Sequence, residues 1–147
     1  VMVAGVGTNC VVVKFQLVTA GPPCIVLDLK GDVTRLKESS IVIKEGCQYR
    51  LKITFRVNRD IVAGLKYCQA VYRHSVRVDR ANHMLGSYGP KAESQTAQTP
   101  MEDAPSGMLA RGHYTVKSKF VDDYNESYLE WEWAFDIKKK WPEEGSD

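Results

Sequence analysis

The residue types that most often carry catalysis are scattered along this sequence. His74, His83 and His113 have no second ligand at metal-binding spacing and no neighbouring nucleophile. The run Gly86–Gly89 reads Gly-Ser-Tyr-Gly, which differs from the Gly-x-Ser-x-Gly nucleophile elbow. The acidic pair Asp122–Asp123 lies in a predicted turn, where aspartate is favoured for local hydrogen bonding. Since a phosphate-binding glycine loop is also missing, the sequence does not indicate an enzyme.

The cysteines form no recognisable metal or redox motif. Cys10, Cys24, Cys47 and Cys68 are far apart, with no Cys-x-x-Cys pair. Two disulfides would be possible in a secreted protein, but the opening segment Val1–Gly7 lacks the basic flank and the length of a signal peptide. We therefore expect free and mostly buried thiols in a cytoplasmic protein that holds no metal or other cofactor.

The small net charge of +2 hides a division along the chain. Between Lys30 and Arg80 there are twelve Lys and Arg residues and five Asp and Glu residues, a charge balance of +7. Between Ala81 and Ile137 there are four Lys and Arg residues and nine Asp and Glu residues, a charge balance of −5. Such asymmetry suggests an oppositely charged partner. We do not expect that partner to be nucleic acid, because the basic residues alternate with apolar ones as on the solvated face of a strand.

The clearest structural pattern is the segment Ser127–Ile137 near the end of the chain. Side chains on a strand alternate between two faces, and here one face is apolar and the other acidic. The apolar set is Leu129, Trp131, Trp133, Phe135 and Ile137. Each aromatic ring buries roughly 150–250 Å², so this face needs a wide apolar partner. The partner could be the filled core of a sandwich, or the rings could line a cavity between two sheets; the pattern leaves both possibilities open.

The rest of the chain reads as short strands separated by turn signals. The expected strands are Val11–Leu17, Ile25–Leu29, Ser40–Lys44, Tyr49–Val57, an irregular Ile61–Val78 with a possible bulge at Gly64, Met84–Tyr88, a short strand within Lys91–Gly112, and Tyr114–Phe120. Asp32 is expected to cap a short helical turn that runs through Leu36. The 147 residues suffice for one domain with a hydrophobic core. The pattern predicts an all-β fold, an immunoglobulin-like antiparallel β-sandwich.

Several motifs in this order resemble the Rho GDP-dissociation inhibitors. They are Ile43–Gly46 (IKEG), Phe55–Val62 (FRVNRDIV), Gly64–Tyr67 (GLKY), Met84–Pro90 (MLGSYGP), Thr99–Pro105 (TPMEDAP), Gly107–Gly112 (GMLARG), Trp131–Trp133 (WEW) and Ile137–Trp141 (IKKKW). The resemblance runs in register from about Val11 to Trp141. It implies a sandwich that holds the geranylgeranyl tail of a Rho-family GTPase between its sheets and extracts the GTPase from membranes. It also implies an N-terminal arm that inhibits GDP release, which we expect to be absent from this sequence.

On this resemblance, residues 1–10 are expected to be a remnant of the N-terminal linker, residues 11–141 the prenyl-binding domain, and residues 142–147 a polar tail. The implied partners are prenylated Rho-family GTPases, preferably GDP-bound, and the geranylgeranyl lipid, with the membrane contacted only transiently during extraction. Two alternatives stay open. One is a generic prenyl or acyl-lipid carrier of similar fold, and the other is a purely structural sandwich.

The resemblance also assigns site residues position by position. The isoprenyl-binding set is Leu17, Ile41, Tyr49, Ile61, Val116 and Trp133. Ile41 stands where the family usually has phenylalanine, which predicts a wider pocket mouth. The acidic patch expected to bind the GTPase is Asp79, Glu93, Glu102, Asp103 and Asp123. In the same region, the segment 94–97 stands where the family has a more acidic and aromatic stretch. Glu130 adds a negative charge beside the tryptophans.

Overall fold

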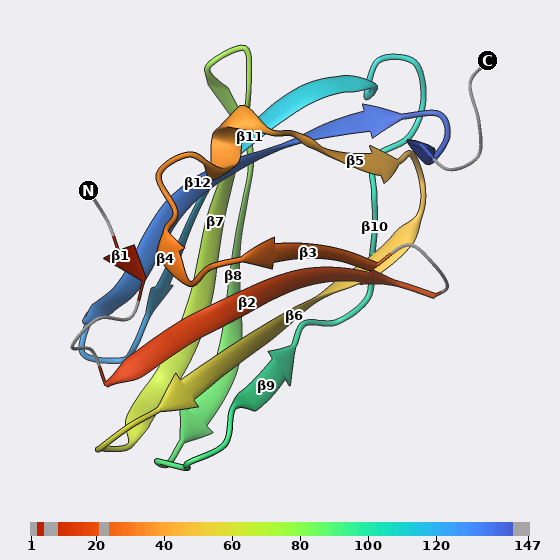
Figure 1. Ribbon diagram of the computed structural model, residues 1–147. Helices are drawn as coiled ribbons and strands as arrows, with labels where there is room; N and C mark the ends of the chain where they lie inside the picture. The colour runs from red at the N-terminus through yellow and green to blue at the C-terminus, as the bar shows by residue number, and fades with distance from the viewer. Residues whose placement is uncertain (1–2, 5–8, 21–23, 143–147) are drawn as a thin grey trace.

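Two β-sheets packed face to face make up most of the computed structural model, which describes residues 3–4, 9–20 and 24–142 (Figure 1). The first sheet has the order β10 (Glu102–Asp103), β6 (Gln48–Val57), β2 (Cys10–Thr19), β3 (Cys24–Asp28), and β9 (Gln95–Gln98) also pairs with β6. The second sheet has the order β5 (Ile41–Lys44), β12 (Ser127–Lys138), β11 (Gly112–Val121), β7 (Val62–Arg73), β8 (Val76–Tyr88). A separate pair joins β1 (Val3–Ala4) to β4 (Gly31–Asp32).

Neighbouring strands are antiparallel throughout, apart from β5, which runs parallel to β12. This arrangement confirms the predicted all-β, immunoglobulin-like sandwich. To reach β5, the chain leaves the first sheet after β3 and crosses to the second. The connection contains the 3-10 helix η1 (Leu36–Glu38), which packs on β12.

The alternation seen in the sequence decides which faces meet. On β6, Leu51, Ile53, Phe55 and Val57 are buried, as their shared parity predicts. On β12, Leu129, Trp131, Trp133 and Ile137 are buried in the same way. Phe15 of β2 joins the two layers, because its ring centroid lies 5.4–5.5 Å from those of Tyr67, Trp131 and Trp133. The core is therefore aromatic at its centre.

The segment expected as one irregular strand, Ile61–Val78, is a hairpin. β7 and β8 are joined by a two-residue turn in which His74 and Ser75 both have positive φ, 51° and 66°. Two positive φ values are the geometry of a type I′ turn, which usually carries Asn or Gly. The expected bulge is confirmed, since the register shifts between Val62 and Leu65 around Gly64. Gly64 has φ of 64°, and a Cβ there would overlap the Asp123 carboxylate.

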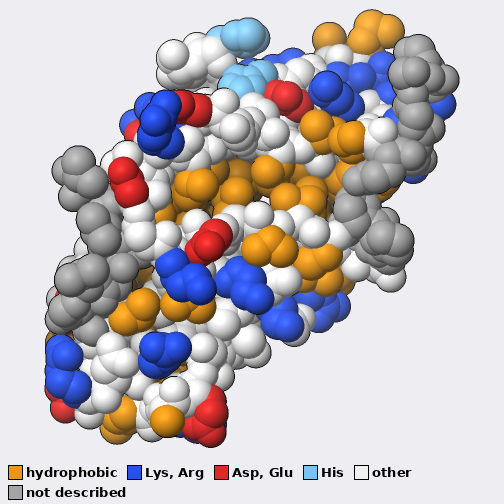
Figure 2. Space-filling model, viewed as in Figure 1, with side chains coloured by type: hydrophobic (Ala, Val, Ile, Leu, Met, Phe, Trp, Pro, Cys, Tyr) orange, Lys and Arg blue, Asp and Glu red, His pale blue; other side chains and the backbone are white. Residues whose placement is uncertain are grey.

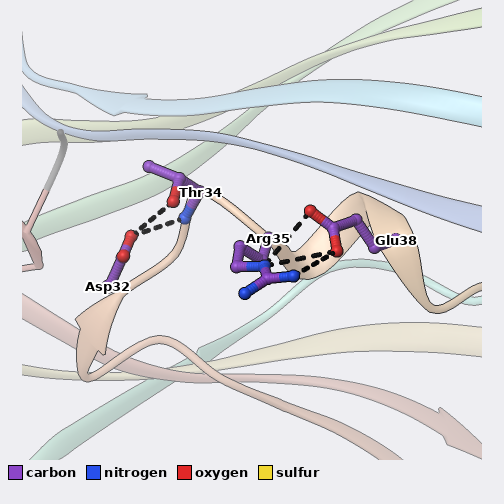
Figure 3. A network of polar contacts seen from close by, with 4 residues as sticks. All are labelled: Asp32, Thr34, Arg35 and Glu38. Atoms are coloured by element: carbon purple, nitrogen blue, oxygen red, sulfur yellow. Dashed lines mark hydrogen bonds and ion pairs between the residues drawn. The ribbon is translucent and has the colours of Figure 1, made fainter.

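The expected cap at Asp32 is wrong. The helix η1 begins at Leu36 with Arg35 in the cap position and no side-chain cap. Asp32 Oδ1 instead accepts hydrogen bonds from the backbone N and the Oγ1 of Thr34, at 2.9 and 2.7 Å. Arg35, directly before the helix, pairs separately with Glu38 at its end, as Figure 3 shows. Asp32 thus closes a local turn before the helix.

The four cysteines, all among the described residues, form no disulfide with one another, and most of them are not buried. Cys10 is buried, whereas Cys24 is exposed and Cys47 and Cys68 are half-buried. Burial raises the pKa of Cys10 to about 12, with a further contribution from the Asp122 charge. The expectation of mostly buried thiols is wrong because three of the four lie on strand faces or ends that contact solvent.

Part of the segment 1–10 packs on the sandwich. Asn9 Oδ1 accepts hydrogen bonds from the backbone N atoms of Arg59 and Asp60, and Asn9 Nδ2 donates to the Asp60 carbonyl. Residues 1–2 and 5–8 of the expected linker, and residues 143–147 of the expected tail, lie outside the described residues.

Candidate functional site

A cavity of about 410 Å³ lies between the two sheets at one end of the sandwich. It is bounded by the first residues of β6 and by β10 on one side, and by the β7–β8 hairpin, the start of β11 and the end of β12 on the other. The apolar lining includes Leu17, Ile43, Leu51, Val71, Val78, Val116, Trp133, Phe135 and Ile137. Its volume is typical of small-molecule sites, which span roughly 300–1,000 Å³. Figure 2 shows hydrophobic side chains gathered between the sheets, with Lys and Arg side chains around them.

A chain of hydrogen bonds holds the Trp133 ring against this cavity. Trp133 Nε1 donates to Ser118 Oγ at 3.0 Å, and Ser118 Oγ lies 2.7 Å from the Tyr67 hydroxyl. The Tyr67 hydroxyl donates to Gln69 Oε1 at 2.8 Å, so Ser118 must donate to Tyr67. Burial raises the pKa of Tyr67 and keeps its hydroxyl protonated. Gln69 itself lines the cavity, so the chain of donors ends at the cavity wall.

The aromatic face of β12 is divided between core and cavity. Trp131 stacks on Phe120, with ring centroids 5.5 Å apart, and contacts Phe15 edge-on. It does not line the cavity, whereas Trp133 and Phe135 do. The sequence left open whether these rings fill the core or line a cavity. Trp131 belongs to the core, and Trp133 and Phe135, further along the same strand, line the cavity.

Four of the six residues expected to bind an isoprenyl group line the cavity: Leu17, Tyr49, Val116 and Trp133. Ile41 does not line it; this half-buried residue is the register partner of Phe135 on the neighbouring strand. Ile61 lies before β7 at the opposite end of the sandwich and is 69% exposed. The structure therefore brings together most of the set, with Ile61 far from the rest.

Three of the five residues expected in the acidic patch line the cavity: Asp79, Glu102 and Asp103. Tyr49 and Glu102 are register partners, and burial, followed by the charge and hydrogen bond of Glu102, raises the pKa of the Tyr49 hydroxyl. Glu93, between β8 and β9, and Asp123, after β11, are exposed residues that do not line the cavity. We call Asp79, Glu102 and Asp103 the acidic rim.

The sequence reasoning missed Arg73 and Tyr114, which also line the cavity. The Arg73 guanidinium lies 5.0 Å from the centre of the Tyr114 ring and donates to its hydroxyl at 3.1 Å. Strand alternation could have identified Arg73, because it shares its parity with Tyr67, Gln69 and Val71. Residues of one parity on a strand turn to the same face, which is here the inner one. A prediction of one irregular strand over Ile61–Val78 does not reveal this shared parity. Among the described residues, the cavity lining therefore contains one cation, Arg73, in addition to the three carboxylates of the acidic rim.

The described residues contain no group of three His, Cys, Asp or Glu side chains that could hold a metal ion. Among the same residues, no helix has the length and apolar character needed to cross a membrane. The cavity lining itself offers apolar contact, a few hydrogen-bonding groups and a charged rim.

Comparison with known proteins supplies relatives for this arrangement. The family model described as RHO protein GDP dissociation inhibitor matches residues 3–140. Rho GDP-dissociation inhibitor 1 of Bos taurus is 52% identical over 134 residues, covering 90% of this chain and 66% of that protein. Rho GDP-dissociation inhibitor 3 of Bos taurus is 46% identical over 134 residues, covering 90% of this chain and 60% of that protein. The chain thus spans about two-thirds or less of the length of these curated relatives.

Among solved structures, a Niemann-Pick type C2 protein from Japanese carpenter ant is similar with a TM-score of 0.48 and 11% sequence identity. That similarity covers 66% of this chain and 79% of the other.

Proposed function

The chain belongs to the Rho GDP-dissociation inhibitor family, and from this premise we propose that it binds the geranylgeranyl tail of a Rho-family GTPase in the cavity between its sheets. In this proposal it acts in the cytoplasm, prefers the GDP-bound GTPase, and touches the membrane only while extracting its partner. The isoprenyl group is assigned to the cavity residues Leu17, Tyr49, Val116 and Trp133. Inhibition of GDP release is assigned to an N-terminal arm rather than to the sandwich.

The observation that carries the proposal is an apolar cavity next to an acidic rim. A prenylated protein with a basic tail is held at an anionic membrane by two contributions. Its lipid gains about 0.8 kcal/mol per buried CH₂, and each basic residue near the surface adds about 1 kcal/mol. An extracting protein must replace both. The cavity offers apolar contact for the lipid, and Asp79, Glu102 and Asp103 offer charge for the tail.

This role needs no catalytic residue, which agrees with membership in a family of GDP-dissociation inhibitors rather than enzymes. A regulator of this kind works by binding alone. The scattered histidines and the missing nucleophile motif are consistent with that role.

The two alternatives make different predictions about the same features. A structural sandwich would have a filled core, and the cavity argues against it. A generic prenyl or acyl carrier would need the cavity but not the acidic rim. Such a carrier would bind a prenylated peptide equally well whether or not the peptide carries a basic segment.

A pull-down with geranylgeranylated and unprenylated Rho-type GTPase tests the proposal. We expect retention of the prenylated form only, and tighter binding of a geranylgeranyl peptide with a basic segment than of one without. The variant Val116→Asp places a charge in the cavity wall and should abolish binding, whereas Lys119→Asp, on the outer face of the same strand, should not. Equal retention of prenylated and unprenylated GTPase would overturn the proposal.

A further inference from the structure

The turn between β10 and β11 presents two adjacent hydrophobic side chains to solvent. Met108 is 79% exposed and Leu109 is 90% exposed. Single exposed hydrophobic residues are common on protein surfaces, but a neighbouring pair at a turn tip is a candidate contact site. Figure 2 shows hydrophobic side chains protruding at the top of the molecule beside Lys and Arg side chains, on the side where Figure 1 places the loop before β11.

The backbone of this turn is held on several sides. Glu45 Oε1 accepts from the Gly107 backbone N at 2.7 Å, and Arg73 Nη1 donates to the Leu109 carbonyl at 2.6 Å. The Tyr114 hydroxyl donates to the Ala110 carbonyl at 2.6 Å. Hydrogen bonds to the Gly107 carbonyl close the turn from within. The exposed side chains therefore sit on a fixed support, and the turn is built to present them.

Basic residues surround the same turn. Arg111 pairs with Glu45 at 2.9 Å, and the charge of Lys139 also acts on Glu45. Lys44 and Lys138 are register partners on β5 and β12, next to the Glu45 backbone N that bonds to the Lys138 carbonyl. Two cations thus act on the Glu45 carboxylate, and the backbone positions of Lys44 and Lys138 are next to it. Glu143 and Glu144, which follow in the sequence, lie outside the described residues.

This cluster adjoins the candidate cavity. Ile43 and Ile137 line the cavity and are adjacent in sequence to Lys44 and Lys138, and Pro105 lines it directly before the turn 106–111. The Gly46 backbone N donates to the Pro105 carbonyl, which joins the segment after β5 to the cavity wall. A surface that docks at this end would therefore lie next to the apolar cavity.

We propose that the turn 106–111, with Lys44, Arg111, Lys138 and Lys139 beside it, docks on the surface of an anionic phospholipid bilayer. Met108 and Leu109 enter the interface between headgroups and acyl chains, and the cations contact the anionic headgroups. An exposed apolar pair combined with a basic cluster is the two-part signal that gives reversible membrane contact. The biological setting of this inference rests on the proposed function, because docking here brings the cavity to the leaflet that holds the prenyl group.

The acidic rim fits the same geometry. The rim lines the cavity, whereas the basic residues lie beside the β10–β11 turn and do not line it, so opposite charges occupy different parts of one end of the molecule. The cluster can face the anionic membrane while the rim receives a basic protein tail. The alternative occupant of the turn is the GTPase itself, and the test separates the two.

Vesicle flotation of the full chain, with no prenylated protein present, tests the inference. We expect the chain to float with phosphatidylserine-rich vesicles, and to float much less with pure phosphatidylcholine vesicles or at high salt. Met108→Asp/Leu109→Asp should lower the partition coefficient roughly tenfold or more, because two apolar contacts become two repelled charges. Lys138→Gln/Lys139→Gln should lower it by roughly thirtyfold.

Matched controls change the same chemistry elsewhere. Tyr124→Asp replaces another exposed hydrophobic residue, at the β11–β12 turn, and Lys117→Gln/Lys119→Gln removes two charges from the outer face of β11. Neither should alter partitioning more than twofold. A chain that does not float, or that loses binding equally with the control variants, would overturn the inference. Since the vesicles hold no GTPase, that result would leave prenyl binding to be judged by the pull-down.

Discussion

The indole N–H of Trp133 and the hydroxyl of Ser118 lie 3.0 Å apart across neighbouring strands, and their hydrogen bond fixes one wall of the cavity. Ser118 is buried at 4% exposure because it takes an inward position among apolar residues of β11. It is accepted there because its hydroxyl bonds both Trp133 and Tyr67. A polar residue in the core thus sets the orientation of an aromatic side chain at the candidate site.

Ser118→Ala should therefore destabilise the protein strongly, although it removes only one hydroxyl group. The change leaves the Trp133 N–H and one Tyr67 lone pair without partners, which costs about 1–3 kcal/mol for a buried donor. The free energy of unfolding, measured by urea melts, should fall by that amount. Ser127→Ala is the control, since this exposed hydroxyl bonds only to Glu130 in the described structure and its loss should change stability by less than about 0.5 kcal/mol. Equal effects would mean that the network contributes nothing.

The two tryptophans of β12 should respond differently to truncation. Trp131 packs against Phe15, Tyr67 and Phe120, so Trp131→Ala should cost about 3–5 kcal/mol of stability. Trp133 borders the cavity, so part of its surface lacks protein contacts and Trp133→Ala should cost less. In a titration with geranylgeranyl peptide, Trp133→Ala should weaken binding more than any loss in stability explains. Full affinity in Trp133→Ala would contradict its place in the lipid site.

Stability should fall in acid because of Asp122. Burial alone would raise the pKa of this carboxyl, but hydrogen bonds from the Tyr128 hydroxyl and from the backbone N atoms of Glu126 and Tyr124 outweigh burial and lower it. Since the folded pKa lies below the ordinary value of 3.8, the stabilisation is complete above that pH and is lost as the pH falls through the folded pKa. Denaturant melts between neutral pH and pH 2 or so should show this slope.

The variant Asp122→Asn isolates that contribution. It should cost about 1–3 kcal/mol at neutral pH, because an amide is a poorer acceptor for three donors. It should also flatten the acid slope relative to the parent protein. Asp123→Asn, at the adjacent exposed position, is the control and should keep the slope. The same acid slope in parent and Asp122→Asn would assign the effect to other carboxyls.

The sequence predicted the faces of the long strands well and the local geometry of turns poorly. Alternation in β6 and β12 is decided by burial, so residues such as Leu51 and Trp133 could be placed on the inner face. The turn at His74 and Ser75 could not be predicted, because neither is one of the Asn, Asp or Gly residues that usually signal a type I′ turn. Without that turn, the inward positions of Val71 and Arg73 were missed.

The alternation of residues along the strands also could not predict how far the cavity extends. Trp131 and Trp133 have the same parity and similar burial, at 5% and 4% exposure, yet one is in the core and the other borders the cavity. Strand parity turns both rings inward, but it does not specify what each ring meets on the opposite sheet. The family resemblance supplied Leu17, Tyr49 and Val116, but it could not show that Ile61 lies at the far end of this fold.

The acidic rim leads to a prediction about association with a prenylated GTPase. Exposed charges at the edge of an interface act mainly on the association rate and its salt dependence, and each exposed pair is worth about 0.2–1 kcal/mol. Glu102→Gln alone should therefore do little. The triple variant Asp79→Asn/Glu102→Gln/Asp103→Asn should slow association several-fold at low salt and flatten its dependence on ionic strength. Binding of an uncharged geranylgeranyl peptide should be unchanged.

The position of the other two carboxylates makes a sharp control. Glu93 and Asp123 were expected in the same patch, but neither lines the cavity. If charge beside the cavity is what matters, Glu93→Gln/Asp123→Asn should keep both the rate and the salt slope of the parent protein in stopped-flow measurements. If instead this double variant flattens the slope and the triple variant does not, the basic tail of the GTPase runs along the opposite end of the sandwich. The lipid and the charge would then be recognised at separate sites, and a basic segment next to the prenyl group would gain nothing from Asp79, Glu102 and Asp103.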